Sequence, residues 1–253
     1  GAAIVETVFG WPGMAAVLVE SAAALDFPLL AALTVGAAAA VLWGFSLAKL
    51  GARSVTYRTD PDNAWMPDLD HIESLIGPAT RAIVIIDPNN PTGVYLGLEE
   101  IEPLAEAVAD CGALLVIDEA YLSFVSGPWD SMGLPAPDNV VLLRSMTKDY
   151  ALTGLRLGYA IASENVIANL QAFQPDWSVN GLAQAAGLAA LADTEYLPRA
   201  RQAIDQAKSL LSDRLDRLSL TVHPSAANFL RRSSSSFNSA PSPAIAKEST
   251  TIW

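Results

Sequence analysis

Cysteine and histidine are scarce in this sequence of 253 residues, which has one cysteine and two histidines. The single cysteine, Cys111, excludes a disulfide within the chain and fits the reducing conditions of the cytoplasm. The histidines, His71 and His223, are far apart along the chain and have no cysteine near them, so the spacing typical of a metal site is missing. The sequence therefore predicts a cytoplasmic protein without a metal centre.

Positive charge is also in short supply, because 15 lysines and arginines stand against 27 aspartates and glutamates, for a net charge of −12. A nucleic-acid partner needs a basic surface that neutralises phosphates, so that class of partner is disfavoured. The charge balance suits an enzyme that acts on small molecules.

Charge of either sign is missing from residues 27–48, an apolar stretch of 22 residues. A stretch of this length can cross a bilayer. However, Pro28, Gly36 and Gly44 interrupt it, and it lacks the basic cluster that usually orients a membrane span. A buried element of a soluble domain is the favoured interpretation, and membrane association is the alternative.

The middle of the chain alternates between apolar, β-branched runs and helical patterns. The runs at residues 81–86, 113–117 and 140–143 predict buried parallel strands, and residues 97–109 predict a helix between the first two. Strands and helices in this order form right-handed crossovers. We therefore expect a three-layer α/β/α large domain with a mainly parallel sheet over residues 51–192, whereas residues 1–50 are poorly assigned.

The C-terminal part has a different character. Residues 193–230 are expected to form a linking helix and the start of a smaller α/β domain. In that helix a stripe of apolar residues at helical spacing is expected to face the core: Ala203, Ala207, Leu210, Leu211 and Leu215. From Arg231 the chain is rich in serine and proline and has no periodicity, so residues 231–253 are predicted to be a disordered tail.

Polar residues follow each of the three predicted strands. Asn90 lies in the turn after the first, Asp118 and Tyr121 follow the second, and Ser145 to Lys148 follow the third. Open α/β sheets bind their ligands at the carboxyl ends of the strands. We therefore expect these three clusters to meet at one edge of the sheet.

The chemistry of the clusters points to a cofactor with an aldehyde and a phosphate. The amine of Lys148 can form a Schiff base with an aldehyde. Two hydroxyls, from Ser145 and Thr147, and the cation of Arg156, eight residues after the lysine, can hold a phosphate. Pyridoxal 5'-phosphate is the common cofactor that offers both groups.

The other polar residues match the remaining groups of this cofactor. The carboxylate of Asp118 can face the pyridine nitrogen and keep it protonated, and Asn90 and Tyr121 are candidates for donors to the phenolic oxygen. Each residue also has a structural interpretation. Asn90 suits a turn, Asp118 and Glu119 suit a helix cap or a solvated pair, and Arg156 suits a surface ion pair.

The three clusters together resemble the class I/II aminotransferases, which are fold-type-I pyridoxal phosphate enzymes. The resemblance rests on three segments, Asn89-Asn90-Pro91-Thr92-Gly93, Asp118-Glu119-Ala120-Tyr121 and Ser145-Met146-Thr147-Lys148 with Gly154-Leu155-Arg156-Leu157-Gly158-Tyr159, and it covers about residues 50–230. It implies an internal aldimine on Lys148, and it implies transfer of an amino group between an amino acid and a 2-oxo acid. It also implies a homodimer.

The same resemblance implies a role for each of the other candidate residues. Asp118 would lie at the ring nitrogen, and Asn90 and Tyr121 at the phenolic oxygen. The phosphate would be bound by Ser145 and Arg156, with Thr147 as a weaker candidate.

Two strings indicate a branch within this family. Leu143 to Lys148 and Asp176-Trp177-Ser178-Val179-Asn180 resemble the branch of amino-acid biosynthesis that contains histidinol-phosphate aminotransferase and threonine-phosphate decarboxylase. Transamination is the first expectation, and decarboxylation of a phosphorylated amino acid is the alternative. The second string also suits a packed loop before a helix. The substrate itself is not specified by the sequence.

The ends of the chain depart from the family pattern. The arginine that binds the substrate carboxylate, the glycine-rich phosphate turn and the aromatic residue that stacks on the cofactor have no recognisable counterparts. We expect both ends to come from a truncated or frame-shifted reading frame around a genuine cofactor-binding core. An inactive fragment of such an enzyme is therefore the non-enzymatic alternative.

Overall fold

The computed structural model describes residues 53, 55–57, 59, 61–134, 137–174, 178–234 and 251–252. The chain divides into two units, residues 1–56 and 57–253, and strand β1 (Val55–Thr56) belongs to the first. All other elements below belong to the second unit. In the described ranges no helix is long and apolar enough to cross a membrane, and no three His, Cys, Asp or Glu side chains are grouped to hold a metal ion. The apolar run at residues 27–48 lies outside these ranges.

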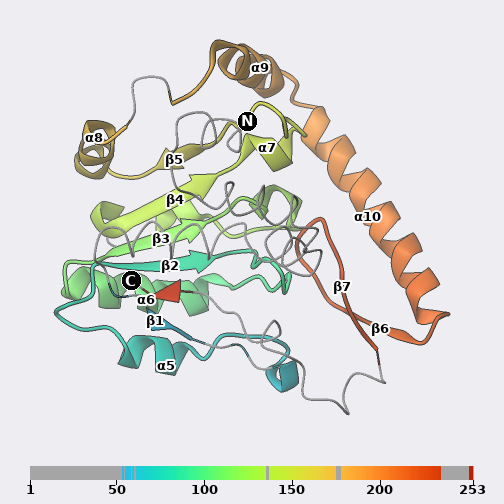
Figure 1. The fold of residues 1–253 in the computed structure, drawn as a ribbon, viewed down its shortest axis with the longest axis horizontal. Coiled ribbons are helices and arrows are strands. Elements are labelled where there is room, and N and C mark those ends of the chain that lie inside the picture. The colour runs from blue at the N-terminus through green and yellow to red at the C-terminus, as the bar shows by residue number, and fades with distance from the viewer. Residues whose placement is uncertain are drawn as a thin grey trace, which may run out of the picture. The chain divides into compact units, whose positions relative to one another are not determined.

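A mainly parallel sheet forms the centre of the second unit (Figure 1). Strands β2 (Ala82–Ile86), β3 (Leu114–Asp118) and β4 (Val140–Arg144) run parallel in that order. The sheet continues with β5 (Tyr159–Ile161) antiparallel to β4 and β8 (Thr251–Ile252) antiparallel to β2. The α/β class and the mainly parallel sheet that the sequence predicts are thereby confirmed.

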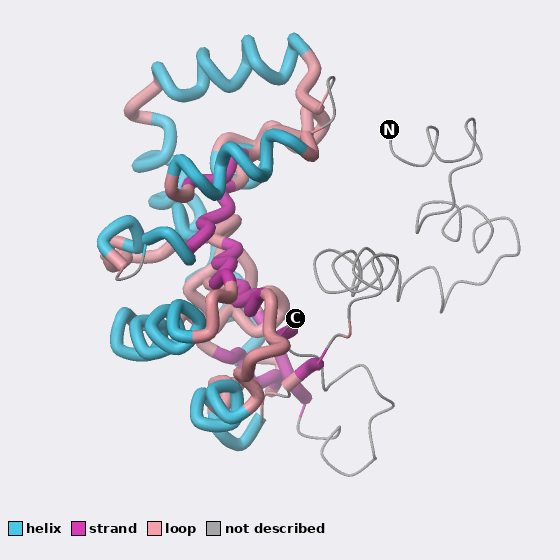
Figure 2. Tube along the Cα trace, turned by 90° about the vertical axis from the view of Figure 1, so that its left-hand side faces the viewer, coloured by secondary structure: helices cyan, strands magenta, loops and turns pink. Residues whose placement is uncertain are grey.

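The helix predicted between the first two strands is α6 (Leu98–Asp110), which packs against β3. It begins after Gly97, whose N–H donates to the carboxylate of Glu100 at 2.7 Å. Helix α5 (Leu69–Ser74) packs beside α6, and both lie on the same side of the sheet (Figure 2). Asp68 caps α5 by accepting from the N–H of His71 at 3.0 Å.

The core lies between this helical layer and the sheet. Its fully buried side chains come from alternate positions of the strands and from one face of α6: Ile83, Ile85, Leu115, Ile117, Ile101, Leu104 and Val108. Because central parallel strands are buried on both faces, their sequences are almost continuously apolar.

The remaining elements complete the second unit. They are 3-10 turns η1 (Pro61–Asn63), η2 (Leu122–Phe124), η3 (Ser131–Gly133) and η4 (Pro137–Asn139), helices α7 (Met146–Asp149), α8 (Glu164–Ala172), α9 (Gly181–Ala192) and α10 (Tyr196–Asp216), and strands β6 (Leu220–His223) and β7 (Arg231–Ser234). Strands β6 and β7 pair antiparallel in a second, two-stranded sheet.

Two expectations for the C-terminal part are wrong. Residues 231–234 and 251–252 form strands β7 and β8, where a disordered tail was predicted, because β6 and β2 offer them pairing partners. The rest of that tail lies outside the described residues. The apolar stripe of α10 does not face a core, since Leu210 is 54% exposed and Leu211 48% exposed. In the described part of the chain this helix packs chiefly against β6. The domain boundaries stay predictions.

Candidate functional site

The carboxyl ends of β2, β3 and β4 bring the three polar clusters to one edge of the sheet (Figure 1). Backbone hydrogen bonds join these segments one step past the strands. The N–H of Asp87 donates to the carbonyl of Asp118 at 3.0 Å, and the N–H of Glu119 donates to the carbonyl of Leu143 at 2.9 Å. The segments that carry Asn90, Asp118 and Ser145 are therefore fixed side by side where they leave the sheet.

Tyr121 links the first and second clusters. Its phenolic oxygen accepts a hydrogen bond of 3.2 Å from the side-chain amide of Asn90. The ring packs edge-on against Phe229, with centroids 5.3 Å apart. Burial raises the pKa of Tyr121, and the bond from Asn90 opposes that rise. The phenol is therefore protonated at neutral pH, and its proton stays available because Asn90 supplies the hydrogen of the bond between them.

Lys148 lies close to Tyr121. Its Nζ atom lies 5.7 Å from the centroid of the Tyr121 ring. Asp118, the last residue of β3, accepts from the N–H of Ala120 at 3.1 Å. Burial raises the pKa of Asp118, while the Ala120 bond and the charge of Lys148 lower it. Four of the predicted site residues, Asn90, Asp118, Tyr121 and Lys148, are thus brought together.

The three candidate phosphate ligands have different surroundings. Ser145 precedes α7 in an extended conformation and its hydroxyl makes no capping bond to that helix. The hydroxyl of the buried Thr147 donates to the carbonyl of Leu157 at 3.2 Å, which leaves it no proton for a phosphate. Arg156 is exposed, has a φ of 57°, and donates from Nη1 to the carbonyl of Thr153 at 3.4 Å. Ser145 and Arg156 are therefore better suited to an anion than Thr147.

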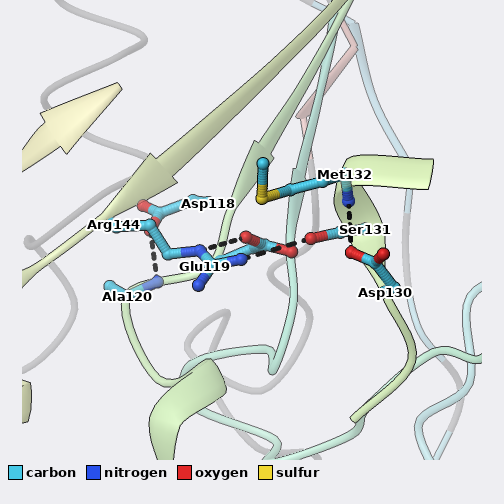
Figure 3. A network of polar contacts seen from close by, with 7 residues as sticks. All are labelled: Asp118, Glu119, Ala120, Asp130, Ser131, Met132 and Arg144. Atoms are coloured by element: carbon cyan, nitrogen blue, oxygen red, sulfur yellow. Dashed lines mark hydrogen bonds and ion pairs between the residues drawn. The ribbon is translucent and has the colours of Figure 1, made fainter. Parts of the chain in front are cut away.

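A buried ion pair between Glu119 and Arg144 lies close to Asp118 (Figure 3). The sequence analysis did not predict it. Glu119 is 3% exposed and accepts from Nε of Arg144 at 2.5 Å. Nη2 of Arg144 also contacts the hydroxyl of Ser131 at 3.3 Å, and Ser131 bonds to Glu119. The interpretation of Asp118 and Glu119 as a solvated pair is wrong, because both carboxylates are largely buried. The sequence contained one sign of this pair: Glu119 and Arg144, which have opposite charges, lie just past two predicted apolar strands.

Asp87 is a second residue that the sequence analysis missed. It follows β2, is 1% exposed, and accepts from the N–H of Leu96 at 2.8 Å. Burial raises the pKa of Asp87 to about 8, and the bond from Leu96 opposes this rise. Since Leu96 closes the loop that begins at Asp87, this bond holds the loop that carries Asn90.

The same loop is held from outside by the segment between β6 and β7. The N–H of Ala226 donates to the carbonyl of Gly93 at 2.8 Å. Lys208 of α10 fastens the segment by donating to the carbonyls of Ser225 and Ala227, both at 2.7 Å. Gly93 has a φ of 76°, and a Cβ atom there would lie 2.2 Å from the Ser225 hydroxyl. This close approach requires glycine.

The second string that indicated a branch of the family, residues 176–180, is only partly described. Asp176 and Trp177 lie outside the described residues. Asn180 caps α9, because its side chain accepts from the N–H of Ala183 at 2.8 Å. This role matches the structural interpretation of the string, a loop before a helix.

Comparison with known proteins identifies the same family that the three sequence motifs resemble. Residues 44–234 match the family model described as aminotransferase class I and II. Histidinol-phosphate aminotransferase of Paramagnetospirillum magneticum is 38% identical over 192 residues, which cover 74% of this chain and 53% of that protein. Histidinol-phosphate aminotransferase 2 of Carboxydothermus hydrogenoformans is 37% identical over 167 residues, which cover 64% of this chain and 46% of that protein.

Solved structures of the same kind are similar in fold. Aspartate aminotransferase from Thermus thermophilus with maleate has a TM-score of 0.63 and 31% identity, and the match covers 69% of this chain and 48% of that one. A putative histidinol-phosphate aminotransferase from Erwinia carotovora atroseptica has a TM-score of 0.61 and 28% identity, with 66% and 50% covered. This chain spans about half the length of the proteins it matches.

Proposed function

The chain belongs to the class I and II aminotransferase family, and from this premise we propose that it forms the cofactor-binding core of an enzyme that transfers an amino group between an amino acid and a 2-oxo acid. The convergence of Lys148, Asp118 and the Asn90–Tyr121 pair at one sheet edge supports this function. The curated relatives cited above are named histidinol-phosphate aminotransferases, which favours an amino compound that carries a phosphate as substrate. Their names favour transamination over decarboxylation.

Enzymes of this family use pyridoxal phosphate, and the residues present fit its groups. The amine of Lys148 suits the aldehyde, the buried carboxylate of Asp118 suits the ring nitrogen, and the hydroxyl of Tyr121 suits the phenolic oxygen. Ser145, with no capping bond, and the exposed Arg156 suit the phosphate. When bound, the cofactor supplies an electron sink that allows the bonds at the Cα atom of an amino acid to break.

Three residues of the chain would move or hold the protons that the reaction requires. Lys148 would take the proton from the substrate Cα atom as a general base and would deliver it, as a general acid, to the carbon that carried the aldehyde of the cofactor. Asp118 must be ionised to hold a proton on the ring nitrogen, and both the Lys148 charge and the Ala120 N–H favour its ionised form against burial. Tyr121 would donate its free proton to the phenolic oxygen, while Asn90 orients the hydroxyl.

The assembly and the location of the protein form part of the same proposal. We expect a homodimer that acts in the cytoplasm on small-molecule amino acids and oxo acids. The single cysteine and the net charge of −12 agree with this setting.

Covalent attachment of the cofactor tests the proposed function. The purified chain would be mixed with pyridoxal phosphate, reduced with borohydride, digested and mapped by mass spectrometry. The sequence has only four lysines, Lys49, Lys148, Lys208 and Lys247, so the peptides are easily told apart. We expect one equivalent on Lys148 and none in Lys148→Ala. Equal labelling of all four lysines would contradict the proposal.

A chain that passes this test would then be assayed for the reaction type. Amine transfer that depends on a 2-oxo acid, without release of carbon dioxide, is expected for an aminotransferase. Carbon dioxide released in proportion to substrate would instead favour the decarboxylase.

A further inference from the structure

The ion pair between Glu119 and Arg144 lies close to Asp118 of the candidate site (Figure 3). Glu119 follows Asp118 at the end of β3, and Arg144 precedes Ser145 at the end of β4. Successive residues of an extended chain point to opposite faces. The ion pair therefore occupies the face opposite to Asp118 and Ser145, where it can act on their positions without touching a bound molecule.

The same two segments are joined through their backbones. The N–H of Glu119 donates to the carbonyl of Leu143 at 2.9 Å, one step past the last paired residues of β3 and β4. The Ser131 hydroxyl contacts both partners of the ion pair and closes a three-residue network. The ends of β3 and β4 are thus held by one backbone bond and one buried ion pair.

A contribution to the stability of the fold does not by itself explain why a buried ion pair occurs at this place. The side chains of Arg144 and Glu119 are only 22% and 2% exposed, so both charges have lost most of their hydration. Apolar residues of similar volume are often as stabilising as a buried ion pair, which differs by having a defined geometry. The geometry of this pair controls two strand ends that carry candidate cofactor ligands.

We propose that Glu119, Arg144 and Ser131 are positioning residues, which hold Asp118 in the required place relative to Ser145 and Lys148. This inference rests on the proposed function. It assigns a role in that function to three residues that touch neither cofactor nor substrate.

The network of Glu119, Arg144 and Ser131 has a second, electrostatic effect on the site. The charge of Glu119 acts on Asp118, Asp87 and Tyr95 as well as on its partner Arg144. Without Arg144, a second buried anion would stand next to Asp118 and oppose ionisation of its carboxyl group. Arg144 therefore also offsets the repulsion between the neighbouring carboxylates of Glu119 and Asp118.

The test compares Arg144→Gln with Arg199→Gln, which breaks the exposed pair between Arg199 and Asp193 (side chains 68% and 47% exposed). Cofactor affinity is measured by absorbance titration. Hydrogen exchange of the Glu119 amide is measured without cofactor. We expect Arg144→Gln to weaken affinity at least tenfold and to speed exchange at least tenfold, Arg144→Lys to recover part of both, and Arg199→Gln to change neither. Affinity within twofold of the unaltered chain and unchanged exchange in Arg144→Gln would overturn the inference.

Ser131→Ala is the milder variant, for use if Arg144→Gln does not fold. It leaves both charges in place, and we expect a several-fold loss of affinity together with faster exchange of the Glu119 amide. Unaltered values of both would overturn the inference. An unaltered chain that fails to attach the cofactor at Lys148 contradicts the proposed function instead, and the exchange measurement still decides whether the network holds the strand ends.

The electrostatic effect has its own readout, the pH midpoint of the absorption of the bound cofactor. We expect Arg144→Gln to shift that midpoint, and the double variant Glu119→Gln/Arg144→Gln to return it toward the original value, because the second anion is gone. A purely structural role would leave the double variant no better than the single one. That result would overturn the charge-balance effect.

Discussion

The side-chain amide of Asn90 donates a hydrogen bond of 3.2 Å to the phenolic oxygen of Tyr121, across a separation of 31 residues in the sequence. The two residues follow β2 and β3, whose last residues, Ile86 and Asp118, are paired in register. A parallel sheet brings such loops together at one edge. The Asn90–Tyr121 bond is therefore a direct product of the topology.

Tyr121→Phe should weaken cofactor binding with little loss of stability. The ring would still pack against Phe229, but the hydroxyl that can donate to the phenolic oxygen would be gone. One hydrogen bond of this kind contributes about 0.5–1.5 kcal/mol, so we expect a roughly two- to tenfold loss of affinity. Absorbance titration measures the affinity and thermal unfolding measures the stability. Affinity equal to that of the unaltered chain would contradict the role given to Tyr121.

Asp118→Asn should lower the reaction rate without lowering the stability of the folded protein. Asparagine keeps an acceptor for the Ala120 N–H but cannot hold a proton on the ring nitrogen. Loss of a positioned acid–base group typically costs about 10²–10⁴-fold in rate. The folded protein should be as stable as before or more so, because burial raises the pKa of Asp118 and opposes its charged form.

The comparison for Asp118→Asn uses single-turnover rates and urea unfolding at neutral pH. A variant that reacts at the original rate would remove Asp118 from the site. A variant that unfolds far more readily would instead indicate that the carboxylate is needed for folding.

Asp87 should give the stability of the protein a distinct pH dependence. Burial raises the pKa of Asp87 in the folded chain to about 8 from an ordinary value of 3.8, so the unfolded chain releases this proton at lower pH than the folded chain does. The contribution of Asp87 to stability is therefore complete below about pH 4 and falls as the pH rises toward 8, by at most about 1.4 kcal/mol per pH unit. Asp87→Asn should lack this slope.

The measurement is urea unfolding of both proteins between pH 4 and pH 9, because their difference isolates Asp87 from the other titrating groups. Asp87→Ala serves as the control, since it leaves the Leu96 N–H without an acceptor and should be about 1–3 kcal/mol less stable than Asp87→Asn at every pH. A stability difference between the unaltered chain and Asp87→Asn that does not change with pH would contradict the prediction.

The strands and their convergence could be predicted from the sequence because both depend on local pattern and general topology. Apolar, β-branched runs such as residues 82–86 are buried strands, and parallel strands share one binding edge. The assignment of Lys148, Asp118, Ser145 and Arg156 to particular groups of a cofactor stays a prediction.

Features that depend on tertiary contacts were missed. The sequence does not specify that Glu119 and Arg144 are neighbours, because that requires the register of β3 against β4. The serines of β7 favour disorder by composition, and the pairing with β6 overrides that preference. The donation of the Thr147 hydroxyl to Leu157 depends on the path of the chain after α7, which no local pattern reveals.

Gly93→Ala should be clearly more damaging than Gly112→Ala. Both glycines have positive φ, 76° and 68°, so alanine would suffer a similar backbone strain of about 1–2 kcal/mol at either position. A Cβ atom at Gly112 meets nothing within 4 Å, whereas one at Gly93 would meet the Ser225 hydroxyl at 2.2 Å. The extra cost at Gly93 thus reports the contact between the Asn90 loop and the segment after β6. Thermal unfolding and cofactor titration of both variants measure it, and Ser225→Gly should recover part of the loss in Gly93→Ala. Equal losses at the two glycines would show that the two segments do not pack this closely.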